Sequence, residues 1–134
     1  MLFRSTFWIL TFTLAAQLAL LSEARAEWER FSENELGDIF FYDKNSVKKD
    51  AYVMVWVLIN YQKPVKVEKS VIQSAKIMIQ LFCKDNVIRS LASFEYSGFN
   101  GEGKLVRSSE SNDAWASIRQ ESPEKDIAQI LCGN

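Results

Sequence analysis

The chain has 134 residues, with 16 Lys and Arg against 17 Asp and Glu, and it contains no histidine. Its net charge of −1 lacks the basic excess that general nucleic-acid binding requires, so we expect no nucleic-acid partner. The absence of histidine removes the Ser-His-Asp and Cys-His nucleophile pairs and the commonest zinc ligand. We therefore predict no catalytic residues, no metal site and no cofactor.

The first 26 residues are typical of a secretory signal peptide. Arg4 is the only charged residue before Glu23, and residues 7–21 are apolar apart from two threonines and one glutamine. This apolar run is shorter than the roughly 20 residues that cross a bilayer as a helix. A positive start followed by a short apolar core predicts export.

The end of this leader carries a cleavage signal. Ala24 and Ala26 form an A-x-A pattern, which predicts cleavage between Ala26 and Glu27. The remaining residues, 27–134, have the length of one domain and keep no stable membrane anchor, with an uncleaved anchor as the alternative. No cysteine follows the predicted cut until Cys83, so a lipid anchor is not expected there. We expect the domain in the periplasm, in the medium or at the cell surface.

Two cysteines, Cys83 and Cys132, remain after cleavage. An even number of cysteines in a small exported domain predicts a disulfide, and two cysteines allow one intramolecular pairing. The alternative is a redox-active or metal-binding pair, but the C-x-x-C spacing and the histidine that favour it are both absent.

Most of the domain predicts β-strands. The segment 51–61, AYVMVWVLINY, is a near-continuous apolar run that predicts a strand buried on both faces. The segment 71–83 alternates between an apolar side and a side with Lys76 and Gln80, which favours a half-buried strand over a helix. The predicted strands, in chain order, are residues 38–43, 51–61, 71–83, 87–97, 104–108 and 115–118.

The third and fourth predicted strands are expected to pair as a hairpin. Matching their apolar faces requires a four-residue loop, 84–87, with Cys83 opposite Ile88. A three-residue loop fits only if a β-bulge intervenes. Leu91 interrupts the alternation of the fourth strand.

The chain ends in a predicted helix over residues 122–132. Ser122 suits the N-cap position, and Pro123 suits the first helical position. Ile127, Ile130 and Leu131 form a narrow apolar stripe. The predicted fold is therefore α+β, an antiparallel sheet of about five to six strands with one C-terminal helix packed on it, closed by the disulfide.

A series of residues along the domain is similar to a known family pattern. The series consists of Trp28, Phe41, Tyr42, Asp43, Ser46, Trp56, Ser74, Cys83, Arg89, Tyr96, Gly101, Gly103, Lys104, Trp115, Ser122 and Cys132. In order and spacing it resembles the surface-adhesin protein E family of exported bacterial domains, over essentially all of residues 27–134. The resemblance implies a sheet-plus-helix fold closed by the disulfide and a non-enzymatic role. The family's namesake is a surface adhesin that binds host matrix and serum proteins.

Three lysines, Lys63, Lys66 and Lys69, are the candidate partner-binding residues, in a loop between strands. Their alternative role is a solvated rim that keeps an edge strand from pairing wrongly. We expect the partner to be a protein, either from the host matrix or from the bacterial envelope, and the sequence sets no oligomeric state.

Two further groups of residues allow other interpretations. The carboxylates Asp38, Asp43 and Glu95 are candidates for an acid–base pair, although Asp43 also suits a turn. The aromatic residues are candidates for a ligand platform, although core packing is the commoner role. This aromatic group consists of Phe40, Phe41, Tyr42, Trp56, Phe94 and Tyr96. The alternative function is a periplasmic enzyme inhibitor or a small enzyme.

Overall fold

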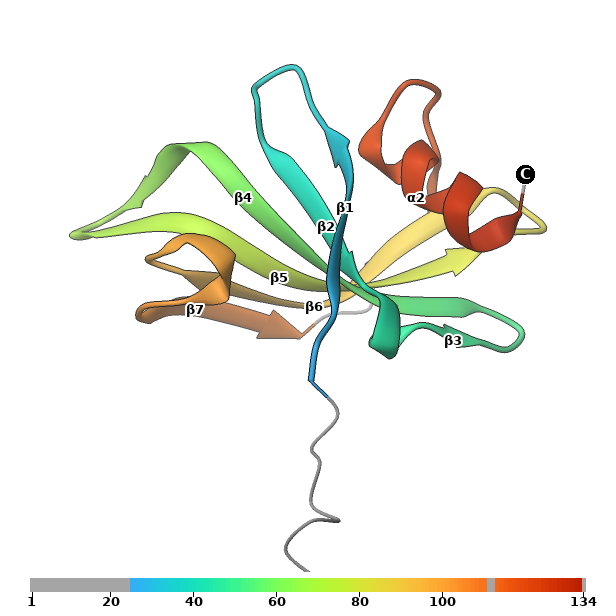
Figure 1. Cartoon of the computed structure of the whole chain (residues 1–134), viewed down its shortest axis with the longest axis horizontal. Helices are drawn as coiled ribbons and strands as arrows, with labels where there is room; N and C mark the ends of the chain where they lie inside the picture. The colour runs from blue at the N-terminus through green and yellow to red at the C-terminus, as the bar shows by residue number, and fades with distance from the viewer. Residues whose placement is uncertain (1–24, 111–112, 134) are drawn as a thin grey trace, which may run out of the picture.

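The computed structural model describes residues 25–110 and 113–133, so the predicted leader lies almost wholly outside the described residues (Figure 1). The described part forms one antiparallel sheet with one α-helix. The elements are β1 (Trp28–Glu33), β2 (Ile39–Asp43), the 3-10 helix η1 (Lys44–Ser46), β3 (Lys48–Lys49), β4 (Val53–Val67), β5 (Ser70–Phe82), β6 (Val87–Tyr96), the 3-10 helix η2 (Phe99–Gly101), β7 (Leu105–Glu110), β8 (Ala116–Ser117) and α2 (Pro123–Cys132).

The sheet has the order β1-β2-β4-β5-β6-β7, while β3 pairs with β4 and β8 pairs with β6. The α+β prediction is confirmed, with eight strands in place of five to six. The sequence pattern predicts neither β1 nor β3. The segment WERFSE of β1 carries three charged residues among six, and β3 consists of two exposed lysines. Both become strands because a neighbouring strand supplies the hydrogen bonds.

The two long central strands are β4 and β5. The strand interpretation of 71–83 is confirmed, since β5 pairs along its length with β4. The expectation that 51–61 is buried on both faces is wrong. Val53, Val55 and Val57 are at most 6% exposed, whereas Met54 and Trp56 on the opposite face are only partly buried. Among the described residues, α2 covers only the valine side of this strand.

The β5–β6 hairpin has a four-residue loop, but at residues 83–86 and not at 84–87. Ile88 therefore lies opposite Leu81 and not opposite Cys83, a shift of two residues that keeps the apolar faces matched. A β-bulge follows between Met78 and Ile79, and Leu91 is the extra residue on β6. The break in alternation at Leu91 is the sequence signal of this bulge.

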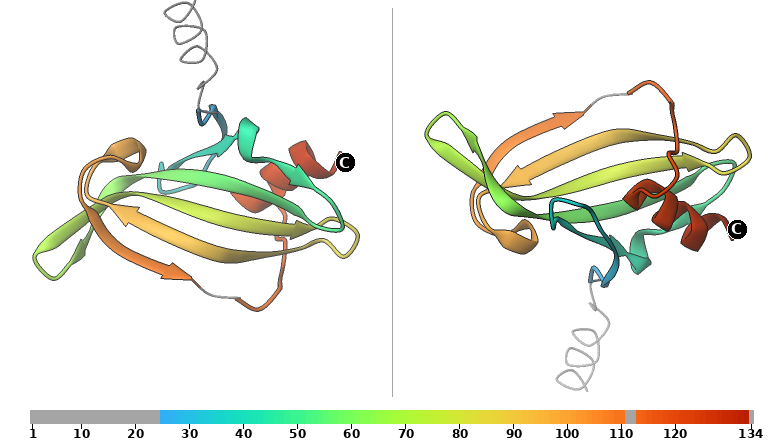
Figure 2. Two further views of the ribbon diagram at one scale, coloured as in Figure 1. Left: turned by 90° about the horizontal axis from the view of Figure 1, so that it is seen from below. Right: turned by 90° about the horizontal axis from the view of Figure 1, so that it is seen from above.

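Helix α2 packs on one face of the sheet (Figure 2). The predicted N-cap is confirmed, because Ser122 Oγ accepts a hydrogen bond of 3.2 Å from the Lys125 backbone N–H. Ile127, Ala128 and Leu131 are buried against the core valines. Ile130, which the predicted stripe includes, is instead 47% exposed.

The predicted disulfide joins Cys83 to Cys132. The two Cα atoms lie 5.7 Å apart, within the range that a disulfide spans. The bond ties the last residue of α2 to the loop between β5 and β6, so the helix is fixed at its C-terminal end. A hydrogen bond of 2.6 Å from Ser32 Oγ to Asp126 Oδ2 joins the first half of the helix to β1.

Candidate functional site

The β4–β5 hairpin extends beyond the rest of the sheet (Figure 2). The pairing of β2 with β4 ends at Asn60, and the pairing of β6 with β5 ends at Ser74. Residues 61–73 therefore form a two-stranded projection, here called the arm. Its tip lies at the opposite end of the molecule from the chain's C-terminus (Figure 1).

All three candidate lysines lie on the arm, and all three are exposed. Their expected loop position is wrong for two of them, because Lys63 and Lys66 lie within β4 while Lys69 lies in the turn after it. Two valines near the lysines are also exposed. Val65, next to Lys66 in β4, is 42% exposed, and Val71, opposite Lys66 on β5, is 41% exposed. The arm thus presents a surface of mixed cationic and apolar character, which protein partners use more readily than a purely charged one.

A β-bulge interrupts the regular strand pairing at the root of the arm. Residues 61–64 of β4 lie opposite a single residue of β5, Gln73, because the regular register stops at Asn60 and resumes at Val65. Pro64 fits here, since a bulge does not require its missing N–H. The side-chain amide of Gln73 donates a 2.8 Å hydrogen bond to the Tyr61 carbonyl and holds the bulge together.

A hollow of about 530 Å³ lies beside the root of the arm. On one side it is bounded by the loop between β1 and β2, and on the other by the bulge. Its lining consists of Glu35, Leu36, Asp38, Tyr61, Lys63, Pro64 and Val65. Leu36 is 75% exposed, which is unusual for a leucine and adds a third apolar contact point to the arm's surface.

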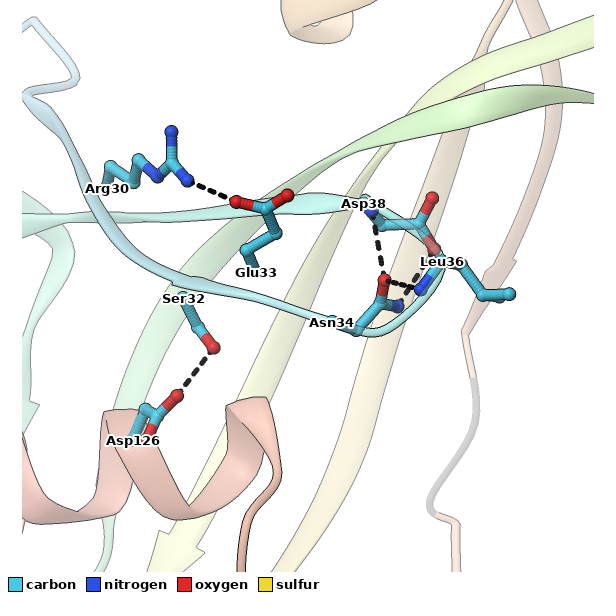
Figure 3. Close-up of polar contacts among 7 residues, drawn as sticks. All are labelled: Arg30, Ser32, Glu33, Asn34, Leu36, Asp38 and Asp126. Carbon is cyan, nitrogen blue, oxygen red and sulfur yellow. Dashed lines mark hydrogen bonds and ion pairs between the residues drawn. The ribbon is translucent and has the colours of Figure 1, made fainter.

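Asn34 holds the loop that presents Leu36, as Figure 3 shows. The Asn34 Oδ1 atom accepts hydrogen bonds from the backbone N–H groups of Leu36 (3.0 Å) and Asp38 (2.9 Å). The Asn34 side-chain amide donates to Asp38 Oδ2 at 2.9 Å. This Asx-type turn fixes the loop with its own side chain, so Leu36 is held out toward solvent.

The surroundings of Tyr61 at the arm's root disfavour the charged form of its phenol. Burial raises the pKa of the Tyr61 phenol above its ordinary value, and the negative charges of Glu95 and Asp38 raise it further. On strand β7, which pairs with β6, the hydrogen bond to the Glu95 carboxylate raises the pKa of Arg107.

The three candidate acid–base carboxylates are held in separate places. Asp38 precedes β2 and accepts a 2.9 Å hydrogen bond from the Gln62 N–H, which ties the loop to the arm. Asp43 ends β2, and its Oδ1 accepts from the N–H groups of Glu27 (2.8 Å) and Asn45 (3.0 Å). Glu95 on β6 pairs with Arg107. Each carboxylate has its own structural role, and no hydrogen bond among the described residues joins any two of them.

The candidate aromatic residues divide between the two faces of the sheet. Phe40 and Tyr42 belong to the core beneath α2, where both rings pack against Phe31 with centroids 6.1 and 6.0 Å away. Trp56, Phe94 and Tyr96 line a cleft on the opposite face. The core interpretation therefore holds for two of the six candidate aromatic residues, Phe40 and Tyr42.

The protein-family comparison identifies this chain. A family model described as surface-adhesin protein E matches residues 28–133. The chain belongs to the surface-adhesin protein E family. The family resemblance in the sequence is thereby confirmed, and the disulfide-bonded domain is an adhesin-like one.

Solved structures of Haemophilus influenzae protein E share the fold. Crystal form II matches with a TM-score of 0.62 at 20% identity, over 84% of this chain and 92% of that chain. Protein E from the non-typeable organism matches with a TM-score of 0.63 at 19% identity, over 84% of this chain and 80% of that chain. A search of curated protein sequences found no match.

The described residues also bear on membrane insertion and metal binding. Within residues 25–110 and 113–133, no helix has both the length and the apolar character needed to cross a bilayer. In the same part of the chain, no three Cys, Asp or Glu side chains gather as potential metal ligands.

Proposed function

We propose that this chain is an exported, non-enzymatic binding domain that contacts a protein partner through the arm. The observation that carries the proposal is the arm itself, a projecting hairpin with three exposed lysines and two exposed valines. A projecting hairpin offers its backbone edge and both faces to a partner at once. Membership of the surface-adhesin protein E family supports a partner outside the cell.

In this proposal residues 1–26 direct export and are then removed, so that the processed chain begins at Glu27. The structure is compatible with a chain that starts there, because Glu27 is bound at both its backbone groups. Its N–H donates to Asp43 Oδ1 at 2.8 Å, and its carbonyl accepts from the Lys44 N–H at 2.9 Å. The partner is either a host extracellular protein or a protein of the bacterial envelope.

The contact at the arm depends on charge. The segment 61–73 holds three lysines and one glutamate, so it favours partners with an acidic surface. Exposed charge pairs contribute about 0.5 kcal/mol each, so loss of all three lysines weakens binding by about tenfold. Rim charges act mainly on the association rate, which should therefore fall as salt rises.

The test is surface plasmon resonance of the processed protein over immobilised host matrix proteins, serum proteins and envelope extract. The triple variant Lys63→Gln, Lys66→Gln and Lys69→Gln removes the arm's positive charge. The matched control is Lys48→Gln, Lys49→Gln and Lys84→Gln, which removes three exposed lysines elsewhere. We expect about tenfold weaker binding for the first variant only. Equal binding by both variants would reject the arm as the contact surface.

A further inference from the structure

The face of the sheet opposite α2 carries an open cleft of about 330 Å³. This volume is at the lower end of the roughly 300–1,000 Å³ that small-molecule sites occupy, so the cleft suits a ligand of one ring. It lies apart from the arm, over the central strands. Its lining consists of Trp28, Asp43, Trp56, Lys76, Phe94 and Tyr96, together with Ala26, which the predicted cleavage removes.

The floor of the cleft is aromatic. The rings of Trp56 and Phe94 lie 5.9 Å apart between centroids, and Trp28 and Tyr96 complete the lining. All four side chains are only partly buried, so their faces are available to a ligand. The faces of aromatic rings are electron-rich and attract the weakly positive C–H groups of a saturated ring.

One cation, Lys76, stands within this aromatic lining. Its ammonium lies 5.9 Å from the centroid of Trp28 and 5.6 Å from that of Tyr96, so it is in cation–π range of both rings. The side chain is partly buried, and no carboxylate pairs with it in the described part of the chain. A side chain at position 101 would collide with the Lys76 stem, so Gly101 allows the lysine to lie where it does.

The cleft also holds one hydrogen-bond acceptor. Asp43 is 8% exposed, and its Oδ1 atom accepts both of its backbone hydrogen bonds, from Glu27 and Asn45. In the processed chain the Glu27 nitrogen is the terminal ammonium, which offsets the negative charge of Asp43 together with the Asn45 N–H. No hydrogen bond within the described residues reaches the other carboxylate oxygen, which can accept from a hydroxyl group. Electron-rich rings, a partly desolvated cation and a carboxylate acceptor are together complementary to a saturated ring that carries both an acid group and hydroxyls.

We propose that this cleft binds an acidic sugar residue, of the uronic or sialic acid class. The sugar's carboxylate pairs with the Lys76 ammonium, the C–H face of its ring stacks on the aromatic floor, and a hydroxyl donates to Asp43. This site is independent of the arm. A protein with both surfaces binds a partner polypeptide through the arm and an acidic glycan through the cleft.

The test compares sugars that differ at one group. Glucuronic acid and glucose have the same ring, with a carboxylate in the first where the second has a hydroxymethyl group. Saturation-transfer NMR and titration calorimetry on the processed protein should give a dissociation constant for glucuronic acid in about the millimolar range. Glucose should bind at least about tenfold more weakly. Measurable binding of glucose with an affinity equal to that of glucuronic acid, or no binding of any acidic sugar, would overturn the proposal.

Variants identify the site. Lys76→Met keeps the stem and removes the charge, so it should lower the affinity for glucuronic acid to that for glucose. The matched control Lys84→Met, at an exposed lysine in the loop between β5 and β6, should leave the affinity unchanged. Trp56→Leu should weaken the binding of both sugars. This second variant still tests the site if Lys76→Met fails to fold. Undiminished glucuronic acid binding by folded Lys76→Met would reject the site.

Titrations with further ligands identify the source of the sugar. Binding of sialic acid without glucuronic acid would assign the cleft to the terminal sugars of host glycoproteins. Binding of glucuronic acid would assign it to uronate-containing polysaccharides, and fragments from host matrix and from bacterial envelopes then separate the two origins. Stronger binding of N-acetylphenylalanine than of either acidic sugar would show a peptide carboxylate site and overturn the proposal.

Discussion

The disulfide provides the strongest quantitative prediction for this domain. The double variant Cys83→Ala and Cys132→Ala removes a cross-link between positions 49 residues apart. In the chain-entropy description, closing a loop of this length lowers the entropy of the unfolded chain by an amount worth about 4 kcal/mol at 25 °C. We expect the variant to lose that much unfolding free energy.

The expected loss is large for a domain of this size. Unfolding entropy is about 2.1 cal/mol/K per residue, or about 230 cal/mol/K for the 108 residues of 27–134. A loss of about 4 kcal/mol then lowers the melting temperature by about 17 °C. The unfolding free energy of a typical domain is only about 5–15 kcal/mol in total, so the variant remains folded at 25 °C with a small remaining unfolding free energy.

The assay is urea unfolding followed by circular dichroism, together with thermal unfolding of the same samples. The wild-type domain treated with a reductant is the matched control, because it loses the cross-link without any substitution. It should agree with the double variant within about 0.5 kcal/mol, the usual scatter of surface substitutions. A loss below about 1 kcal/mol in both samples would refute the loop-closure reasoning.

Three further predictions concern single contacts. Ser122→Ala removes the N-cap of α2, so the unfolding free energy in urea should fall by about 1 kcal/mol, and an unchanged midpoint would show that the cap is dispensable. Because the pKa of Tyr61 is raised on folding, its contribution to stability is complete below about pH 10 and is lost as pH rises through the raised pKa. Tyr61→Phe should flatten the decline of stability above about pH 10, and a decline as steep as in the wild type would contradict this assignment. Asp43→Asn should lower the unfolding free energy by about 2 kcal/mol in a chain beginning at Glu27, because Asp43 pairs there with the terminal ammonium. The cost should be smaller in a chain extended before Glu27, and equal costs would disprove the ion pair.

Local patterns predict the central strands and the helix well. Residues 71–83 alternate strictly enough to identify a strand, and Ser122 with Pro123 marks the start of α2 within one residue. These signals are local, because alternation and capping depend only on neighbouring residues. β1 has no such signal. It is a strand because β2 pairs with it, and its Ser32 is buried because Asp126 of the helix lies against it.

Register and helix orientation depend on distant parts of the chain. The two-residue shift at the β5–β6 loop keeps apolar faces matched, so parity alone does not distinguish it from the predicted register. Ile130 and Ala128 are both apolar, and only the position of the sheet decides that Ala128 is buried while Ile130 is exposed. The cysteine pairing was predictable because two cysteines allow one pairing.

The candidate sites also combine features that the sequence predicts with features that depend on the tertiary structure. The lysines were identifiable as a cluster, since Lys63, Lys66 and Lys69 lie within seven residues. Their position on a projection was not, because it follows from where β2 and β6 stop pairing with the central hairpin. Trp56, Phe94 and Tyr96 of the cleft were identifiable as candidates for a ligand platform, but their grouping around Lys76 was not. Its lining residues come from five strands and from the residue that precedes the domain, and only the pairing of those strands brings Lys76 between Trp28 and Tyr96.

The sequence by itself determined the properties that neighbouring residues or simple counts specify. These are the single possible disulfide, the alternating strands and the capped helix. The tertiary structure decided which strands end early, which face of the sheet the helix covers and which side chains meet across strands. The physical reason is that pairing and burial depend on the free energy of the whole sheet, to which residues far apart in the chain contribute together.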